Sequence, residues 1–176
     1  MRIIAGRWGG RRLRVPRGGA VRPTADRVRE AWMSALQPDL EGATVADLFA
    51  GSGALGLEVL SRGARRVTFV EKSPASLAAL RANIAALGAE RDARIAREDA
   101  FAFVRGVERP YDLVLADPPY ERGLATRLVE AFLNRPFAAA LWIEHSRRET
   151  LPACPAARTR RYGDTLLTTI TADHAR

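Results

Sequence analysis

The sequence predicts an α/β fold with a doubly wound, mostly parallel sheet that ends in an antiparallel hairpin. Short apolar segments typical of buried strands alternate with amphipathic segments typical of helices between residues 44 and 143. A glycine-rich turn, Gly51-Ser52-Gly53-Ala54-Leu55-Gly56, joins the first of these strands to the following helix. Two further strand segments, 158–162 and 165–171, flank the tight turn Gly163-Asp164. In such a sheet, ligands bind at the carboxyl ends of the strands.

The first 30 residues carry nearly all of the net positive charge of the chain. The 176 residues include 28 Lys+Arg and 20 Asp+Glu, which gives a net charge of +8. Only Asp26 and Glu30 offset the nine arginines of this segment, which are Arg2, Arg7, Arg11, Arg12, Arg14, Arg17, Arg22, Arg27 and Arg29. This charge pattern is typical of nucleic-acid contact, although a GC-rich genome would also favour arginine codons.

The N-terminal segment predicts a hairpin and then a helix. Residues 2–5 and 12–15 read as short strands with Gly9-Gly10 as a turn between them, and the alternative is a disordered basic tail. Thr24 is the N-cap of a helix that ends at Pro38. Its apolar stripe consists of Val28, Ala31, Trp32, Ala35 and Leu36. Arg27, beside that stripe, either contacts a substrate or cofactor or is solvated.

Asp47 stands between the first buried strand, residues 44–46, and the glycine turn. A fixed carboxylate at this place would repel the pyrophosphate of NAD or FAD, which prefers bare backbone amides. It would attract a ligand with a positive charge, and S-adenosylmethionine carries an ammonium and a sulfonium. The alternative is that Asp47 only accepts hydrogen bonds from the amides of the loop.

Two more strands follow, each with an acid at its end. Glu71 comes after the strand 66–70, 24 positions beyond Asp47. Nucleotide sites place an acid near this position to bind the ribose hydroxyls, and the alternative is an ordinary strand-end carboxylate. Ser73-Pro74 begins a helix that Gly88 ends. The strand 94–96 leads to Glu98-Asp99-Ala100 and a short helix.

The fourth strand, 111–116, runs into Asp117-Pro118-Pro119-Tyr120. The prolines hold the chain extended and donate no backbone hydrogen bond, so the Asp117 side chain and the Pro118 carbonyl can face one spot. An exocyclic aromatic amine fits there, because two acceptors stabilise the positive charge that develops as it takes up a methyl group. Tyr120 offers a face on which a base can stack. The alternative is a proline-stiffened turn.

The rest of the chain adds a helix over 124–132 and a fifth strand, 139–143, which ends at Glu144. A single Cys154 excludes an internal disulfide, and together with His145 and His174 it does not make a zinc site, so we expect no metal. The sequence shows neither the apolar core of a signal peptide nor a membrane-spanning run. We therefore expect a soluble, cytoplasmic protein.

At these motifs the chain resembles the class I S-adenosylmethionine-dependent methyltransferases and, more narrowly, the small bacterial 16S rRNA guanine-N2 methyltransferases. Many amino-methylating enzymes share the glycine turn and Asp117-Pro118-Pro119-Tyr120. The narrower likeness lies in Arg22-Pro23-Thr24 and Asp26-Arg27-Val28-Arg29-Glu30 after the basic N-terminus. The resemblance implies a seven-stranded, Rossmann-like methyltransferase sheet. It also implies two parts, a basic RNA-binding extension at 1–23 and the methyltransferase domain at 24–176.

The resemblance further implies which ligands the chain binds and through which residues. The cofactor would be S-adenosyl-L-methionine, held by Asp47, Phe49, Ala50, Gly51, Ser52, Gly53, Glu71 (on the ribose), Asp99 and Ala100 (on the adenine). The target guanine would bind at Asp117, Pro118, Pro119 and Tyr120. The rRNA would contact Arg7, Arg11, Arg12, Arg22, Thr24 and Arg27. The expected partner is 16S rRNA or the assembling small ribosomal subunit, and the expected state is a monomer.

Three alternatives share part of this evidence. DNA adenine-N6 and cytosine-N4 methyltransferases use the same Asp-Pro-Pro-Tyr motif, but usually with a separate target-recognition domain for which 176 residues leave no room. An NAD-dependent oxidoreductase would use the glycine turn, but Asp47 and the lack of a second catalytic domain argue against it. A noncatalytic RNA-binding module would not need the intact acidic and aromatic residues.

Overall fold

A seven-stranded sheet forms the centre of the protein, in the order β3-β2-β1-β4-β5-β7-β6. The computed structural model describes residues 1–16, 23–120 and 122–172, and for 23–27 only the backbone. The parallel strands are β1 (Thr44–Leu48), β2 (Arg66–Val70), β3 (Ala93–Ala96), β4 (Tyr111–Ala116) and β5 (Ala138–Ser146). The hairpin of β6 (Ala157–Tyr162) and β7 (Thr165–Thr171) joins antiparallel to β5 through β7. The predicted fold class is therefore confirmed.

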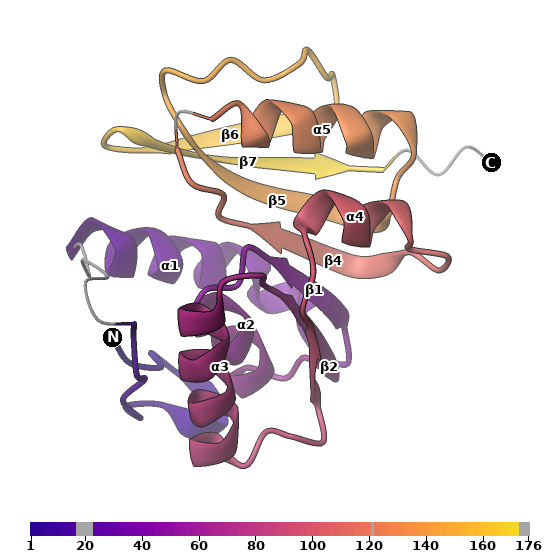
Figure 1. Cartoon of the computed structure of the whole chain (residues 1–176). Coiled ribbons are helices and arrows are strands. Elements are labelled where there is room, and N and C mark those ends of the chain that lie inside the picture. The colour runs from indigo at the N-terminus through magenta and orange to yellow at the C-terminus, as the bar shows by residue number, and fades with distance from the viewer. Residues whose placement is uncertain (17–22, 121, 173–176) are drawn as a thin grey trace.

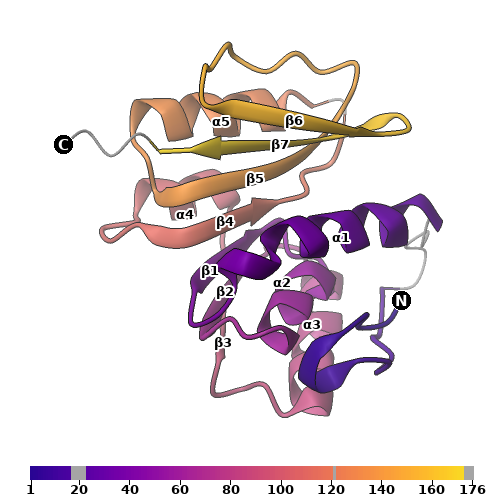
Figure 2. The same cartoon turned by 180° about the vertical axis from the view of Figure 1, so that it is seen from behind.

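Helices cover both faces of this sheet. They are α1 (Pro23–Leu36), α2 (Ala54–Ser61), α3 (Pro74–Leu87), α4 (Ala100–Arg105) and α5 (Leu124–Asn134), with short 3-10 turns at Gly6–Trp8 and Gln37–Asp39. Figures 1 and 2, which view the molecule from opposite sides, show α4 and α5 on one side of the sheet and α1 on the other. Alternate residues of the strands accordingly divide between two apolar cores. Val45 and Phe69 pack with α1, α2 and α3, whereas Leu48 and Val70 pack with α4 and α5.

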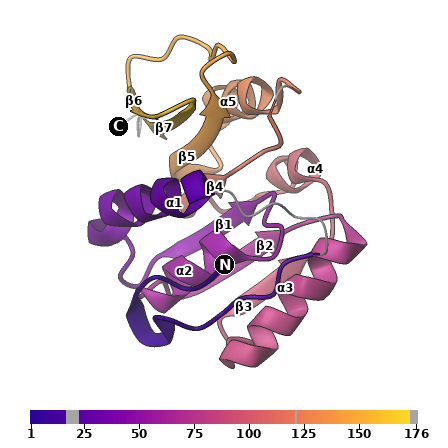
Figure 3. The same cartoon turned by 90° about the vertical axis from the view of Figure 1, so that its left-hand side faces the viewer.

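The N-terminal segment, residues 1–16, is an ordered hairpin that packs on α2 and α3 (Figure 3). Arg2 and Arg12 form an antiparallel bridge, and the buried side chains of Ile3 and Leu13 belong to the same core as these helices. The two predicted strands shrink to that single bridge for a physical reason. The amides of Ile4 and Ala5 donate to the buried Glu58 carboxylate of α2 instead of continuing a strand ladder.

Most element boundaries agree with the sequence patterns, and the exceptions have local causes. The bounds of β2, β4 and β7 match, and α3 has the predicted caps, with the Ser73 hydroxyl accepting from Ser76 N and Gly88 at φ 63°. Helix α2 begins at Ala54, earlier than its apolar stripe, because Gly53 at φ 84° ends the preceding turn. Strand β5 continues to Ser146 because its last residues pair with β7.

Candidate active site at the carboxyl edge of the sheet

The glycine loop and the Asp117 turn lie next to each other because the strands that precede them are neighbours. Leu48 at the end of β1 pairs with Ala116 at the end of β4, and Ala116 pairs with Ile143 of β5. A cavity of about 220 Å³ opens at this edge. It is lined by Met1, Arg29, Trp32, Asp47, Phe49, Ala50, Gly51, Ser52, Ala54, Leu55, Asp117 and Glu144.

The buried carboxylate of Asp47 stabilises the glycine loop through a hydrogen bond to its backbone. Its Oδ2 accepts a hydrogen bond from the Gly56 amide at 2.9 Å. A Cβ atom on Gly56 would lie 2.9 Å from that oxygen and 2.4 Å from the Phe69 ring, so only glycine fits at the start of α2. Phe49 adopts a left-handed φ of 61°, which turns the chain out of β1. Asp47 thus accepts a hydrogen bond from a loop amide, as its alternative interpretation predicted, but it also lines the cavity.

Glu71 holds the other side of the loop. Its Oε2 accepts from the Gly51 amide at 2.8 Å, and its Oε1 accepts from the amides of Lys72 and Ser73. The carboxylate at the end of β2 is therefore tied to the loop that follows β1, where a nucleotide site requires it. Its contact with a ribose stays a prediction.

Asp99 caps α4 and pairs with Lys72. Its Oδ1 accepts from Phe101 N at 2.9 Å, and its Oδ2 lies 2.8 Å from Lys72 Nζ. The hydrogen bond from Lys72 holds the pKa of Asp99 below its ordinary value. Ala100, the first residue of α4, is buried, and Phe49 meets Phe101 edge to face at 6.4 Å between ring centres. The adenine contact of Asp99 and Ala100 stays a prediction.

Of the four residues in the Asp117 turn, Asp117 lines the cavity, whereas Pro118, Pro119 and Tyr120 lie outside its lining. Pro118 is buried and Pro119 is exposed. The Tyr120 hydroxyl donates to Glu144 Oε1 at 2.5 Å and lies 2.9 Å from Thr165 Oγ1 of β7. Burial and the neighbouring Glu144 raise the pKa of Tyr120, so the phenol stays protonated and remains a donor. These two contacts hold the Tyr120 hydroxyl and thereby fix the orientation of the ring.

Three carboxyl groups share this small space, and each holds its proton more tightly than an exposed acid. Burial raises the pKa of Asp47 to about 7, and the charges of Asp117 and Glu71 add to the effect. Burial also raises the pKa of Asp117 and of Glu144, and the charge of Asp117 raises that of Glu144 further. Solvent reaches Asp117, but this residue sits in a recess where protein atoms replace much of its hydration. The cavity therefore favours a cationic ligand.

Two residues on α1 add donors to the same cavity. The indole Nε1 of Trp32 is buried and has no acceptor among the described residues. Arg29 is also buried and donates from Nη2 to the backbone oxygen of Arg2 at 2.8 Å. Because an unsatisfied buried donor is costly, we expect the indole N–H to meet an anionic or polar group of a ligand.

The predicted RNA-binding arginines lie on the N-terminal hairpin where the structure describes them. Arg7 pairs with Asp92 at 3.2 Å and stacks 3.9 Å from the centre of the Trp8 ring. Arg11 donates to the Ala86 oxygen at 2.7 Å, and Arg12 is exposed. Arg22 and the side chains of Thr24 and Arg27 lie outside the described residues. RNA contact by these residues stays a prediction.

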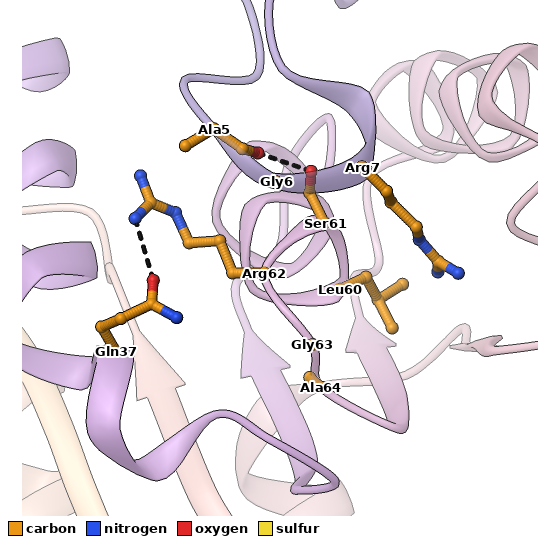
Figure 4. A pocket seen from close by; sticks show the side chains of 9 residues that line it. All are labelled: Ala5, Gly6, Arg7, Gln37, Leu60, Ser61, Arg62, Gly63 and Ala64. Carbon is orange, nitrogen blue, oxygen red and sulfur yellow. Dashed lines mark hydrogen bonds between the residues drawn. The ribbon is translucent and has the colours of Figure 1, made fainter.

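A second cavity, of about 540 Å³, lies at the opposite edge of the sheet, between the N-terminal hairpin and the end of α2 (Figure 4). Its two arginines already have partners, since Arg62 contacts Glu58 and Gln37, and Arg7 contacts Asp92. It contains no acid cluster and no part of the glycine loop. We therefore place the chemistry in the smaller cavity at the carboxyl edge.

Sequence patterns did not identify every residue of the site. Glu144 lies near the carboxyl end of β5 as Asp47 lies near that of β1, so the rule that ligands bind at strand ends could have included it. Trp32 and Arg29 fit the ordinary stripe and flank of a helix, and no sequence signal separates them from structural residues. Among the described residues there is no cluster of metal-binding side chains, and no helix is both long and apolar enough to cross a bilayer.

Known proteins resemble this chain over most of its length. The family described as Conserved hypothetical protein 95 matches residues 1–171. Ribosomal RNA small subunit methyltransferase D of Escherichia coli is 39% identical over 89% of this chain and 80% of its own length. An rRNA methyltransferase of Bacillus subtilis, provisionally so named, is 32% identical over 86% of both chains.

Solved structures agree with these sequence relatives. An Escherichia coli structure, provisionally described as the methyltransferase yhhF, is 36% identical, covers 96% of both chains and superposes with a TM-score of 0.84. The 16S rRNA N2 G1207 methyltransferase of Thermus thermophilus, in complex with AdoMet and guanosine, shares the fold with a TM-score of 0.68. It is 24% identical over 88% of this chain and 44% of its own length.

Proposed function

Because the chain belongs to the Conserved hypothetical protein 95 family, together with the small-subunit ribosomal RNA methyltransferases D, we propose that it methylates the exocyclic N2 of a guanine in 16S rRNA. The methyl donor is S-adenosylmethionine. The observation that carries the proposal is the meeting of the glycine loop and the Asp117 turn at one cavity. This is the arrangement that brings a donor's methyl group to a base nitrogen, and the family likeness points to a target of the guanine-966 type.

The side chains around the cavity fit this cofactor chemically. The raised pKa values of Asp47 and Glu144 mark carboxyl groups that a nearby positive charge would stabilise in the ionised form, and the cofactor carries an ammonium and a sulfonium. The buried indole N–H of Trp32 lacks an acceptor among the described residues, and the cofactor carries a carboxylate. When bound, S-adenosylmethionine supplies a methyl group that is electrophilic because it is attached to a positively charged sulfur.

The chain's own residues orient the amine and receive its proton. The Asp117 carboxylate and the Pro118 carbonyl accept its two N–H bonds, which favours a pyramidal nitrogen whose lone pair is available. The new N–C bond would replace the methyl–sulfur bond of the donor and leave S-adenosylhomocysteine. The nitrogen loses one proton, and Asp117 is the adjacent base whose raised pKa suits it to take that proton. The Tyr120 ring, anchored by Glu144 and Thr165, supports the face of the base.

The test is transfer of labelled methyl from S-adenosylmethionine to small ribosomal subunits, and to naked 16S rRNA, from a strain that lacks the gene. Nucleoside digestion and mass spectrometry then identify the product. We expect N2-methylguanosine at a single site. N6-methyladenosine or N4-methylcytidine would replace the proposal by its nearest alternative, and no transfer to either RNA would reject it. Asp117→Ala should abolish transfer and retain cofactor binding.

A further inference from the structure

Glu144 stands beside the amine-binding residue Asp117 at the edge of the sheet. Ala116 and Ile143 are paired in the parallel register of β4 and β5, so the residues that follow them, Asp117 and Glu144, are neighbours. Neighbouring strands are about 4.8 Å apart. Both side chains line the same cavity. Any base that presents its amine to Asp117 therefore presents the adjacent ring atom near Glu144.

One oxygen of Glu144 is fixed and the other is available. Oε1 accepts the Tyr120 hydroxyl, which itself lies 2.9 Å from Thr165 Oγ1. No hydrogen bond from another described residue reaches Oε2 of Glu144 or either oxygen of Asp117. The Tyr120 and Thr165 hydroxyls therefore orient a carboxylate whose second oxygen can accept a hydrogen bond from a ligand in the cavity.

The bases differ at the ring atom beside the amine. In guanine the N2 amine adjoins N1–H, so two donors stand side by side on the Watson–Crick edge. In adenine the N6 amine adjoins N1, and in cytosine the N4 amine adjoins N3, and both of these ring nitrogens are acceptors. An ionised carboxylate only accepts hydrogen bonds, so at a pH above the raised pKa of Glu144 it pairs with guanine and repels the other two bases.

We propose that Glu144 accepts a hydrogen bond from N1–H of the target guanine, beside Asp117 at N2, and thereby makes the enzyme specific for guanine. The inference rests on the proposed N2 transfer and goes beyond it, because the Asp-Pro-Pro-Tyr motif alone also serves adenine and cytosine enzymes. Glu144 then has two roles: it positions Tyr120 through Oε1, and it recognises the base through Oε2. In the alternative interpretation Glu144 only positions Tyr120 and does not contact the base.

The two interpretations are separated by pairing a protein variant with a base analogue. Small subunits are reconstituted with 16S rRNA that carries, by splinted ligation, either guanine or 2-aminopurine at the methylated position. 2-Aminopurine keeps the reactive amine, but its N1 is an acceptor. Glu144→Gln keeps an oxygen for the Tyr120 hydroxyl and places an N–H₂ donor where Oε2 was. Initial rates give kcat/KM for each enzyme on each base.

We expect wild-type protein to prefer guanine by about 100-fold or more, since a mismatched acceptor leaves Oε2 of the half-buried Glu144 carboxylate without a donor and repels it. Glu144→Gln should lower this preference at least tenfold and should methylate 2-aminopurine faster than wild type does. Tyr120→Phe, which keeps the carboxylate, is the matched control and should slow both bases while keeping the preference. Any difference in intrinsic reactivity between the two amines cancels when the guanine-to-2-aminopurine ratio of kcat/KM is compared between variant and wild type.

An unchanged preference in Glu144→Gln would overturn the inference. Wild-type protein that methylates both bases equally would also overturn it, and that measurement does not depend on the folding of a variant. Binding of S-adenosylhomocysteine by calorimetry checks that each variant retains the cofactor site. Failure of wild-type protein to methylate guanine at all would instead reject the proposed function, so the two failures are distinguishable.

Discussion

At the scale of single residues, Asp47 carries a charge that burial opposes. It is 1% exposed, and its pKa is about 7 in the folded protein against an ordinary value of 3.8. The folded state therefore binds more protons than the unfolded chain between these pH values, and the free energy of unfolding falls as the pH rises from about 4 to 7. Asp117 and Glu144 act with the same sign because their pKa values are also raised.

Asp47→Asn should therefore stabilise the cofactor-free protein at pH 8, by roughly 1–4 kcal/mol. The amide oxygen can still accept from Gly56 N, so the loop contact remains while the buried charge is removed. Thermal unfolding from pH 5 to pH 8 should show a shallower decline of Tm in the variant than in wild type. Cofactor affinity should fall, because the ammonium loses its carboxylate. Equal slopes in both proteins would contradict the assigned burial effect.

Trp32→Phe tests the buried indole N–H at the cavity. Wild-type protein should bind S-adenosylmethionine more tightly than decarboxylated S-adenosylmethionine, because only the first offers a carboxylate to this donor. The variant should lose about tenfold of that preference. Calorimetric Kd values for both ligands measure it. Trp142→Phe is the control, since Trp142 lies away from this cavity, in a groove beside β6 and β7. A preference unchanged in Trp32→Phe would exclude the indole contact.

Residue roles could be predicted from the sequence where they lie in one contiguous motif. Asp117 and Tyr120 lie within four consecutive residues, and the stiffness of the two prolines between them indicates their arrangement. Trp32 could not be predicted, because its position in the cavity depends on how α1 crosses the sheet edge. The strand-end rule could have placed Glu144 at this edge, but its position beside Asp117 depends on the register of β5 against β4, which no local pattern specifies.

At the scale of elements, Asn83 of α3 joins the N-terminal hairpin to the glycine loop. The side chain is 1% exposed. Its Oδ1 accepts from Arg14 N at 2.7 Å, and its Nδ2 donates to Arg14 O and to Ser52 O, each at 2.9 Å. A single amide thus ties a basic segment and a cofactor loop to one helix, so displacement of one affects the other.

Asn83→Ala should lower the free energy of unfolding by about 2–4 kcal/mol, because it leaves three backbone groups without their partner. It should weaken binding of both S-adenosylhomocysteine and rRNA. Ser61→Ala is the matched control: Ser61 bonds the hairpin through Trp8 N and Ala5 O but does not touch the glycine loop. It should weaken rRNA binding and leave cofactor affinity within about twofold. Equal loss of cofactor affinity in both variants would contradict the link through Asn83.

Elements with strong local signals were predicted more accurately than those that depend on distant partners. Helix α3 carries its own caps in Ser73 and Gly88, and its bounds follow from them. The N-terminal hairpin depends on Glu58, a residue more than fifty positions away that captures the Ile4 and Ala5 amides. Its predicted strands therefore shorten, although the prediction of an ordered segment is correct.

At the scale of the whole molecule, acidic and basic residues are concentrated in different regions. The cavity at the carboxyl edge is rich in carboxyl groups, whereas the hairpin on α2 and α3 is rich in arginine. An RNA backbone is attracted to the hairpin, and a cationic cofactor is attracted to the cavity. The predicted boundary between residues 1–23 and 24–176 stays a prediction, although Ile3 and Leu13 share a core with α2 and α3.

If the hairpin contacts RNA phosphates directly, its arginines should determine the salt dependence of binding. Arg11→Gln with Arg12→Gln removes two positive charges from the hairpin. Arg105→Gln with Arg109→Gln removes two exposed charges from the end of α4 and the loop that follows it. The first pair should reduce the slope of log Kd against log salt by about 1.5–2, since each lost phosphate contact releases about one counterion fewer. The second pair should leave the slope unchanged.

A general electrostatic attraction would instead predict equal changes for both pairs, because both remove the same charge. Filter binding to 16S rRNA from 50 to 300 mM salt therefore separates local contact from the overall field of a chain with a net charge of +8.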